Sequence, residues 1–183
     1  MKELVPLIEG CDAKRYLSSV PDNGRTLIIV GDHPDKWHDA AWAKGIVGEH
    51  DNMAINAAAD GAAMDYCAIL HSYNIGLPEF PESTIHPSTH VVGLRCGRES
   101  KRVDQTIAAE PVGGTSALFA VIAGLVLGYK RLYLCGVRLE PGSIYYDEHV
   151  VQNWKRWKPV LSPALTVIAP AGCWLKELYH ERT

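Results

Sequence analysis

Two glycines and two hydroxyl residues, at positions 113–116, precede a long apolar stretch of the chain. They are Gly113, Gly114, Thr115 and Ser116, and the apolar run that follows them is predicted to be helical. The first N–H groups of a helix lack partners within the helix, and the helix dipole adds about half a positive charge there. Glycine lets an anion approach the backbone, and a hydroxyl group can donate to it. The segment therefore predicts an anion site, although an ordinary helix cap at Thr115 would leave the same pattern.

Histidine and tyrosine side chains are the candidates for proton transfer. His33 directly follows a predicted strand, and Tyr145, Tyr146 and His149 lie close together after another one. An imidazole among carboxylates is suited to act as a general base, and a tyrosine hydroxyl can bind a phosphate. A polar surface loop with half-buried tyrosines is an equally good interpretation of the second group.

The cysteines and the remaining histidines do not form a metal-binding pattern. The five cysteines are scattered along the chain and form no CxxC pair. His86 and His90 have the spacing of a helical ligand pair, but Pro87 lies between them. We therefore expect no metal site, and thiols that stay reduced, as is typical of a cytoplasmic protein.

The overall composition predicts a globular protein without a nucleic-acid partner. The chain has 183 residues, of which 47% are hydrophobic and 21% are charged. Its net charge of -3 at pH 7 does not suit a polyanion. Residues 1–16 lack the apolar core of a signal peptide. The apolar run after Ser116 reaches Lys130 before the roughly twenty apolar residues that a membrane span needs, so we expect no such span.

Short apolar runs alternate with helical patterns along the chain. Strands are predicted at 27–30, 53–56, 65–70, 90–96, 131–135 and 165–169, and helices at 37–43, 115–127, 151–157 and 172–180. Unbroken apolar strands are typical of a parallel sheet that helices cover on both faces. We expect a single Rossmann-like α/β domain over residues 1–183, with a mainly parallel sheet flanked by helices. Residues 1–24 are interpreted as an N-terminal extension packing on it, and the polar stretch 97–105 as exposed.

The loops after the predicted strands are the places to look for a site. Ligands of open parallel sheets bind beyond the carboxyl ends of the strands. The corresponding positions in this sequence are 31–34, Asn56, 71–72, 136–138 and 170–172.

The segment GTSALFAVIAGLVLGYKRLYLCGVRL, residues 114–139, resembles a block of the bacterial sialyltransferases. The related hydroxymethylpterin diphosphokinase-like family shares this block, in which a helix start rich in small residues leads to an apolar helix, an LGYK turn and a strand. Weaker matches occur in the same order at LIIVGDHP, MAINAAAD and LTVIAPAGCWLKEL. The resemblance covers most of residues 27–179, and it implies a Rossmann-like fold that binds a nucleotide or nucleotide-sugar.

The resemblance also implies roles for individual residues. Such enzymes transfer a sugar without a metal or other cofactor, using a histidine as base and tyrosines that assist the departing phosphate. His149 is the nearest histidine to the paired tyrosines. The residues implied to line the nucleotide site are Gly31, Asp32, Asn56, Thr115, Ser116 and either Tyr145 or Tyr146. Asp32 stands where the family has an amide, and Arg138 stands where the family has an acid.

Two other functions remain open on the sequence alone. A phosphoryl transferase of the diphosphokinase-like kind would need Mg²⁺, held by converging carboxylates such as Asp32, Asp35 or Asp147. A non-catalytic relative would keep the ligand pocket without a placed base.

Tryptophans are the candidates for an apolar contact in a homo-oligomer. Trp37, Trp42, Trp154 and Trp157 could form a subunit contact or lie in the core.

Overall fold

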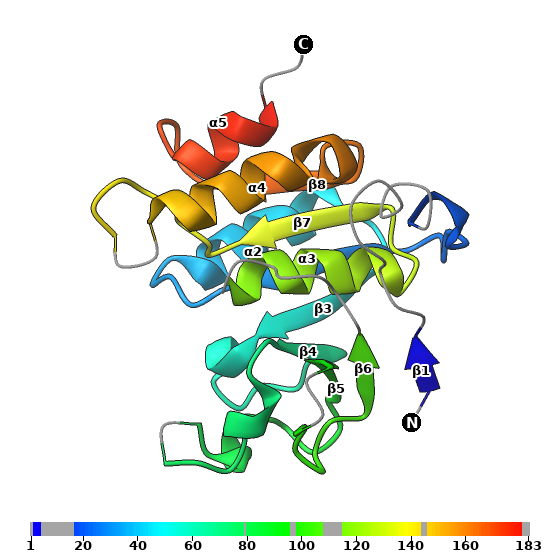
Figure 1. Ribbon diagram of the computed structural model, residues 1–183. Helices are drawn as coiled ribbons and strands as arrows, with labels where there is room; N and C mark the ends of the chain where they lie inside the picture. The colour runs from blue at the N-terminus through cyan, green and yellow to red at the C-terminus, as the bar shows by residue number, and fades with distance from the viewer. Residues whose placement is uncertain are drawn as a thin grey trace.

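Eight strands form one sheet in the part of the chain that the computed structural model describes, and every neighbouring pair of strands is parallel (Figure 1). The described residues are 2–4, 17–78, 80–95, 98–107, 115–143 and 146–180. The strands are β1 (Lys2–Leu4), β2 (Thr26–Val30), β3 (His50–Ile55), β4 (Tyr66–Ile69), β5 (His90–Leu94), β6 (Gln105–Ile107), β7 (Arg131–Cys135) and β8 (Leu165–Ile168). Their order in the sheet is β1-β6-β5-β4-β3-β2-β7-β8. The predicted Rossmann-like α/β architecture is thereby confirmed.

Helices cover both faces of this sheet. They are α2 (Lys36–Ile46), α3 (Ser116–Val126), α4 (Glu148–Leu161) and α5 (Trp174–His180), with the short 3-10 helices η1 (Asn56–Ala59), η2 (Ser72–Asn74) and η3 (Glu82–Thr84). On one face, α2 buries Ala40 and Ala43 against Ile28, Val30 and Cys135. On the other face, α3, α4 and α5 share a larger apolar cluster with the sheet. The central strands are apolar on both sides because both sides are covered.

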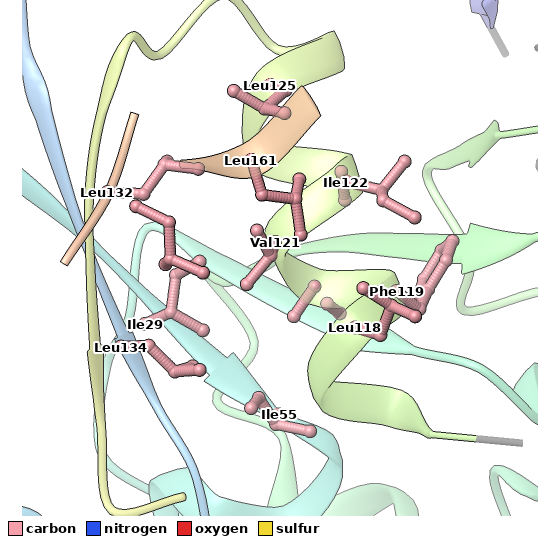
Figure 2. Packing of buried hydrophobic residues seen from close by; sticks show 14 of the residues in the cluster. Ile29, Ile55, Leu118, Phe119, Val121, Ile122, Leu125, Leu132, Leu134 and Leu161 are labelled. Carbon is pink, nitrogen blue, oxygen red and sulfur yellow. The ribbon is translucent and has the colours of Figure 1, made fainter. Parts of the chain in front are cut away.

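Helix α3 lies at the centre of the larger cluster. Nine of its eleven residues are buried, including Leu118, Phe119, Val121 and Ile122. Figure 2 shows Val121 near Leu161 of α4 and the strand residue Ile29 on one side of α3, and Phe119 on the other side of the helix. A helix that is apolar on all sides is stable only where all of its sides are buried, and the sheet and the neighbouring elements bury α3 in this way. The start of α3 is therefore held rigidly at the edge of the sheet.

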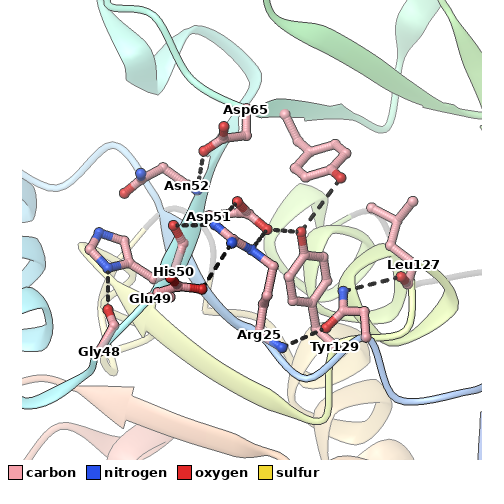
Figure 3. A network of polar contacts seen from close by, with 11 residues as sticks. Arg25, Gly48, Glu49, His50, Asp51, Asn52, Asp65, Leu127 and Tyr129 are labelled. Carbon is pink, nitrogen blue, oxygen red and sulfur yellow. Dashed lines mark hydrogen bonds and ion pairs between the residues drawn. The ribbon is translucent and has the colours of Figure 1, made fainter.

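The amino ends of the strands are joined by a charged network around Asp51 of β3 (Figure 3). Arg25, just before β2, donates to both carboxylate oxygens of Asp51, at 2.8 and 2.6 Å. Tyr129, in the turn after α3, donates its hydroxyl to the same carboxylate and lies 3.5 Å from the Tyr66 hydroxyl. The network ties β2, β3, β4 and the α3–β7 turn together at the edge opposite the predicted site.

Several boundaries differ from the predictions, for local reasons. The helix predicted at 37–43 continues past Gly45 to Ile46, because an exposed glycine late in a helix is tolerated where the other face packs on a sheet. Helix α4 begins at Glu148 rather than 151, since the Asp147 carboxylate accepts from Val150 N at 2.8 Å and caps it.

Two strands were not predicted. The prediction of an exposed stretch at 97–105 is wrong at its end, where Gln105 begins β6 and Arg102 donates to Thr89 O at 2.8 Å. Residues 2–4, predicted to belong to an extension, form β1 and pair in parallel with β6. Both strands have only three residues, which is too short for a periodic signal.

Candidate functional site at the carboxyl edge of the sheet

The short helix η1 follows β3 directly and has a residue in the left-handed conformation at each end. Asn56 has φ 52° and Asp60, which ends η1, has φ 50°. Non-glycine residues adopt this conformation at a cost, and asparagine and aspartate tolerate it best. The buried thiol of Cys67 on β4 donates to the Asn56 carbonyl at 3.1 Å and holds the turn in place. Strained residues of this kind cluster at functional sites.

Asn56 reaches across to the first residue of α3. Its Nδ2 donates to Ser116 Oγ at 3.0 Å, and both side chains are half-buried. Thr115 occupies the N-cap position in extended backbone, and its carbonyl accepts from Phe119 N. Three of the residues predicted to line a ligand site therefore meet where the carboxyl end of β3 faces the amino end of α3.

A buried lysine binds the other end of η1. Lys36 is the first residue of α2, and its Nζ lies 2.8 Å from Asp60 Oδ2 and 3.1 Å from Asp32 Oδ1. Only 9% of the Lys36 side chain is exposed, whereas the two carboxylates are 63% and 84% exposed. Burial alone lowers the pKa of Lys36, but the hydrogen bonds to Asp60 and Asp32 outweigh it and raise that pKa. Lys36 is therefore held in its charged form between the two carboxylates.

Lys36 was not predicted as a site residue. A lysine in a helical pattern usually belongs to the solvated face, and nothing in the sequence indicates that Asp60 folds back onto it. The available signal was the spacing of Asp32 and Lys36, which suits an ion pair across the start of a helix.

The crevice between β2 and β7 is the point where the chain reverses direction across the sheet. From β2 the strands proceed outward to β6 on one side, and β7 and β8 are added on the other side. A ligand is expected at such a point. Here the two loops fill it themselves: a Cβ on Gly31 would lie 2.5 Å from Gly136 O and 2.5 Å from a methyl carbon of Val137. The glycine predicted to contact the nucleotide thus permits close packing of the two loops.

Arg138 and Asp39 form a buried ion pair beside this crevice. Arg138 Nη2 lies 2.8 Å from Asp39 Oδ2, and each side chain is 7% exposed. The same oxygen accepts from Gly136 N at 3.1 Å, and Arg138 Nη1 donates to Ile168 O at 3.2 Å. The arginine that departs from the family pattern therefore has a structural partner in α2.

The three predicted catalytic residues make their contacts elsewhere. His33 Nδ1 accepts from Asp35 N at 3.1 Å, at the end of β2. The Tyr146 ring packs edge-on against Trp174 of α5, with ring centroids 5.9 Å apart. His149 is exposed in the first turn of α4. These contacts do not bring the three residues to the Asn56–Ser116 pair.

Three other predicted residues, Gly113, Gly114 and Tyr145, lie outside the described residues. Among the residues that are described, no group of three or more histidine, cysteine or acidic side chains could hold a metal ion. None of the helices described is long and apolar enough to cross a membrane.

Comparisons with protein-family models, with curated proteins and with solved structures found no match to this chain.

Proposed function

We propose that the protein binds an anionic, nucleotide-type ligand at the carboxyl edge of the sheet, between η1 and the start of α3, and uses it as a donor in sugar transfer without a metal. The observation that carries the proposal is the hydrogen bond from Asn56 to Ser116. It joins two segments that sequence reasoning had separately predicted to contact the same ligand.

The chemistry of this edge suits a phosphate. The N–H groups in the first turn of α3 lack helical partners and point out of the helix. A serine hydroxyl that accepts from Asn56 still has its own proton to donate to a phosphate oxygen. At the far end of η1, Lys36 is paired with Asp60 and Asp32, and the exposed Asp32 carboxylate can accept from the hydroxyl groups of a ribose.

The arrangement favours metal-independent chemistry over a Mg²⁺-dependent phosphoryl transfer. Asp32 and Asp60 do converge, but they converge on the Lys36 ammonium group, which takes the position a cation would need. Asp147, a further carboxylate considered for Mg²⁺, caps α4 instead. A divalent ion between these two carboxylates would have to displace the ammonium group.

A second candidate function is ligand binding without transfer. In the transferase, a base removes the proton of the acceptor hydroxyl while the bond between sugar and phosphate breaks. His33, Tyr146 and His149 are the groups proposed for this chemistry. His33 contacts Asp35, Tyr146 contacts Trp174 and His149 is exposed, and because none of these contacts is with Asn56 or Ser116 they favour the binding function. The two functions share the same ligand site and differ only in turnover.

Calorimetry with CMP, CDP, UDP and their sugar conjugates, each with Mg²⁺ and with EDTA, tests the proposal. We expect binding of at least one of them, with the same affinity under both conditions. Binding that requires Mg²⁺ would favour the phosphoryl transferase, and binding by none of them would refute the site. Release of the free nucleotide in the presence of sugar acceptors separates the transferase from the binding protein.

A pair of charge-adding variants locates the site. Ser116→Asp places a carboxylate at the first residue of α3, where it suits the helix dipole, so the fold should persist while the anion is repelled. Ser88→Asp adds the same charge at an exposed position before β5, at the opposite edge. We expect the first variant to lose binding and the second to keep it. If both variants bound the nucleotide with the same affinity, Ser116 would have only a structural role at the start of α3.

A further inference from the structure

A second concave surface lies away from η1 and α3. It is a cleft of about 670 Å³ between α2, β8 and α5. Its lining residues are Asp35, His38, Asp39, Trp42, Arg138, Thr166, Val167, Ile168, Ala169, Pro170, Lys176 and His180. Neither Asn56 nor Ser116 is among them, and the proposed nucleotide site is separate from it.

The cleft exists because α2 covers only part of its face of the sheet. Helix α2 contacts β2 and β7, which leaves β8 to form the floor of the cleft. Most of the exposed surface that lines the cleft is apolar, although seven of the twelve lining residues are polar or charged. Trp42 stands at its wall with 53% of its surface exposed. An exposed indole beside an apolar floor is costly to leave in water, and it suits a flat apolar ligand.

The charges around the cleft are unevenly distributed. On the α2 side, Arg138 lies 2.8 Å from Asp39 and 3.9 Å from Asp35, so both carboxylates face a cation. The α5 wall contributes Lys176 and His180 to the lining and no carboxylate. Within residues 17–180, as far as the structure describes them, neither Lys176 nor His180 forms an ion pair with a carboxylate, and both lie at one end of the cleft.

Lys176 and His180 are also fixed in position. Lys176 Nζ donates to Ala169 O at 2.6 Å, and the His180 ring lies 3.3 Å from Val167 O. Both carbonyls lie on the outer edge of β8, so the two basic side chains cover that edge and protect it from further strand pairing. An ammonium group that donates one proton to Ala169 has two more for a ligand.

We propose that this cleft binds a small amphipathic anion, with a flat apolar body over β8 against Trp42 and a single carboxylate or sulfonate at Lys176. The placement of charge favours an anion: Lys176 is half-buried and His180 exposed at one end, whereas at the other end Asp39 is buried against Arg138 and Asp35 lies 3.9 Å from the same guanidinium group. The apolar floor selects a ring system over a polar metabolite such as a free sugar.

Calorimetry with naphthoate, and with the uncharged naphthyl methanol of the same ring, tests the proposal on the intact chain. We expect naphthoate to bind at least about tenfold more tightly, as one charge-assisted hydrogen bond provides. Trp42→Ala should abolish binding, and Lys176→Gln should weaken naphthoate to the level of the alcohol. The nucleotides tested for the first site should not displace it.

The chain offers matched controls. Trp37 lies on the same helix and is 42% exposed, yet it does not line the cleft, and Lys44 is an exposed lysine of α2 outside the lining. Trp37→Ala and Lys44→Gln should bind naphthoate as the wild type does. Equal binding of acid and alcohol, or equal losses in control and cleft variants, would overturn the proposal. A further outcome would also overturn the proposal: the wild type is a dimer, Trp42→Ala makes it monomeric, and naphthoate does not bind. The cleft would then be a subunit contact.

Discussion

Removal of the Tyr129 hydroxyl should cost more stability than removal of any comparable buried hydroxyl with a neutral acceptor. Tyr129 is 1% exposed and donates to the carboxylate of Asp51, which also binds Arg25. Tyr129→Phe keeps the ring, so the variant removes the hydrogen bond to Asp51 together with the longer contact to the Tyr66 hydroxyl. Tyr179 provides the matched control, because its buried hydroxyl donates to a neutral carbonyl, Trp154 O, at 3.1 Å.

The two acceptors set the expected magnitudes. A hydrogen bond to a charged group contributes about 1.5–3 kcal/mol, and one between neutral groups about 0.5–1.5 kcal/mol. Tyr129→Phe should therefore lower the free energy of unfolding by about 2 kcal/mol, roughly twice the effect of Tyr179→Phe. The loss also leaves the half-buried Asp51 carboxylate with one donor fewer.

The effect of Tyr129→Phe should depend on pH. Burial by itself raises the pKa of Asp51, but the hydrogen bonds from Arg25 and Tyr129 outweigh it, and the pKa in the folded protein lies below the ordinary value. A carboxyl group with a depressed pKa stabilises the fold above its unfolded pKa of about 3.9, and that contribution is lost as the pH falls through the folded pKa. The difference between wild type and variant should therefore be largest at neutral pH and should shrink in acid.

Urea unfolding followed by circular dichroism, from about pH 7 down to about pH 3, measures both variants against the wild type. We expect the Tyr129→Phe difference to diminish over the acidic part of this range and the Tyr179→Phe difference to stay constant. A Tyr129→Phe effect that equals the control and does not change with pH would refute the assignment of the hydrogen bond to a charged carboxylate.

Three further predictions concern packing, charge and thiols. Gly31→Ala should destabilise the fold by about 1–3 kcal/mol in thermal unfolding, since its Cβ would meet a backbone oxygen at 2.5 Å; an unchanged melting temperature would contradict that packing. Arg138→Ala should cost about 3–5 kcal/mol because it leaves Asp39 buried without its partner, and a double variant that also replaces Asp39 should cost less than the two single losses together. Burial raises the pKa of Cys67 and of Cys135 to about 12, so peptide mapping after iodoacetamide treatment should find both unmodified in the native protein and modified in urea.

Most of the sheet and helix α3 could be predicted because their short stretches of sequence have the length and the apolar composition of buried strands and helices. The LIIV run of β2 and the apolar stretch of α3 each satisfy the length and composition of a fully buried element, and both lie within a residue of their predicted bounds. By contrast, the three residues of β6 are polar or β-branched and form a strand only because β5 offers them an edge. Such pairing depends on the tertiary structure and cannot be predicted from a short stretch of sequence.

The candidate site could be derived from the sequence only to the extent that it follows from topology. The rule that ligands bind beyond the carboxyl ends of strands selected Asn56, and the helix-start chemistry selected Ser116; their hydrogen bond joins the two. The role of Lys36 could not be predicted, because it depends on Asp60 turning back through a left-handed backbone conformation. Gly31 was assigned to a ligand from the family resemblance and from its place after a predicted strand, whereas the space around it is set by Gly136, a residue far along the chain.

The position of β2 has a consequence for the order in which the chain can fold. Thr26 of β2 pairs on one side with His50 and on the other with Arg131, so one partner is synthesised early and the other late. Domains fold from the amino terminus as they emerge from the ribosome, and distant pairings form slowly. Until β7 is made, the apolar LIIV strand has an open edge, which is the kind of surface that recruits other chains into aggregates. Chains truncated before Arg131 should therefore be the form of this protein that most needs a chaperone.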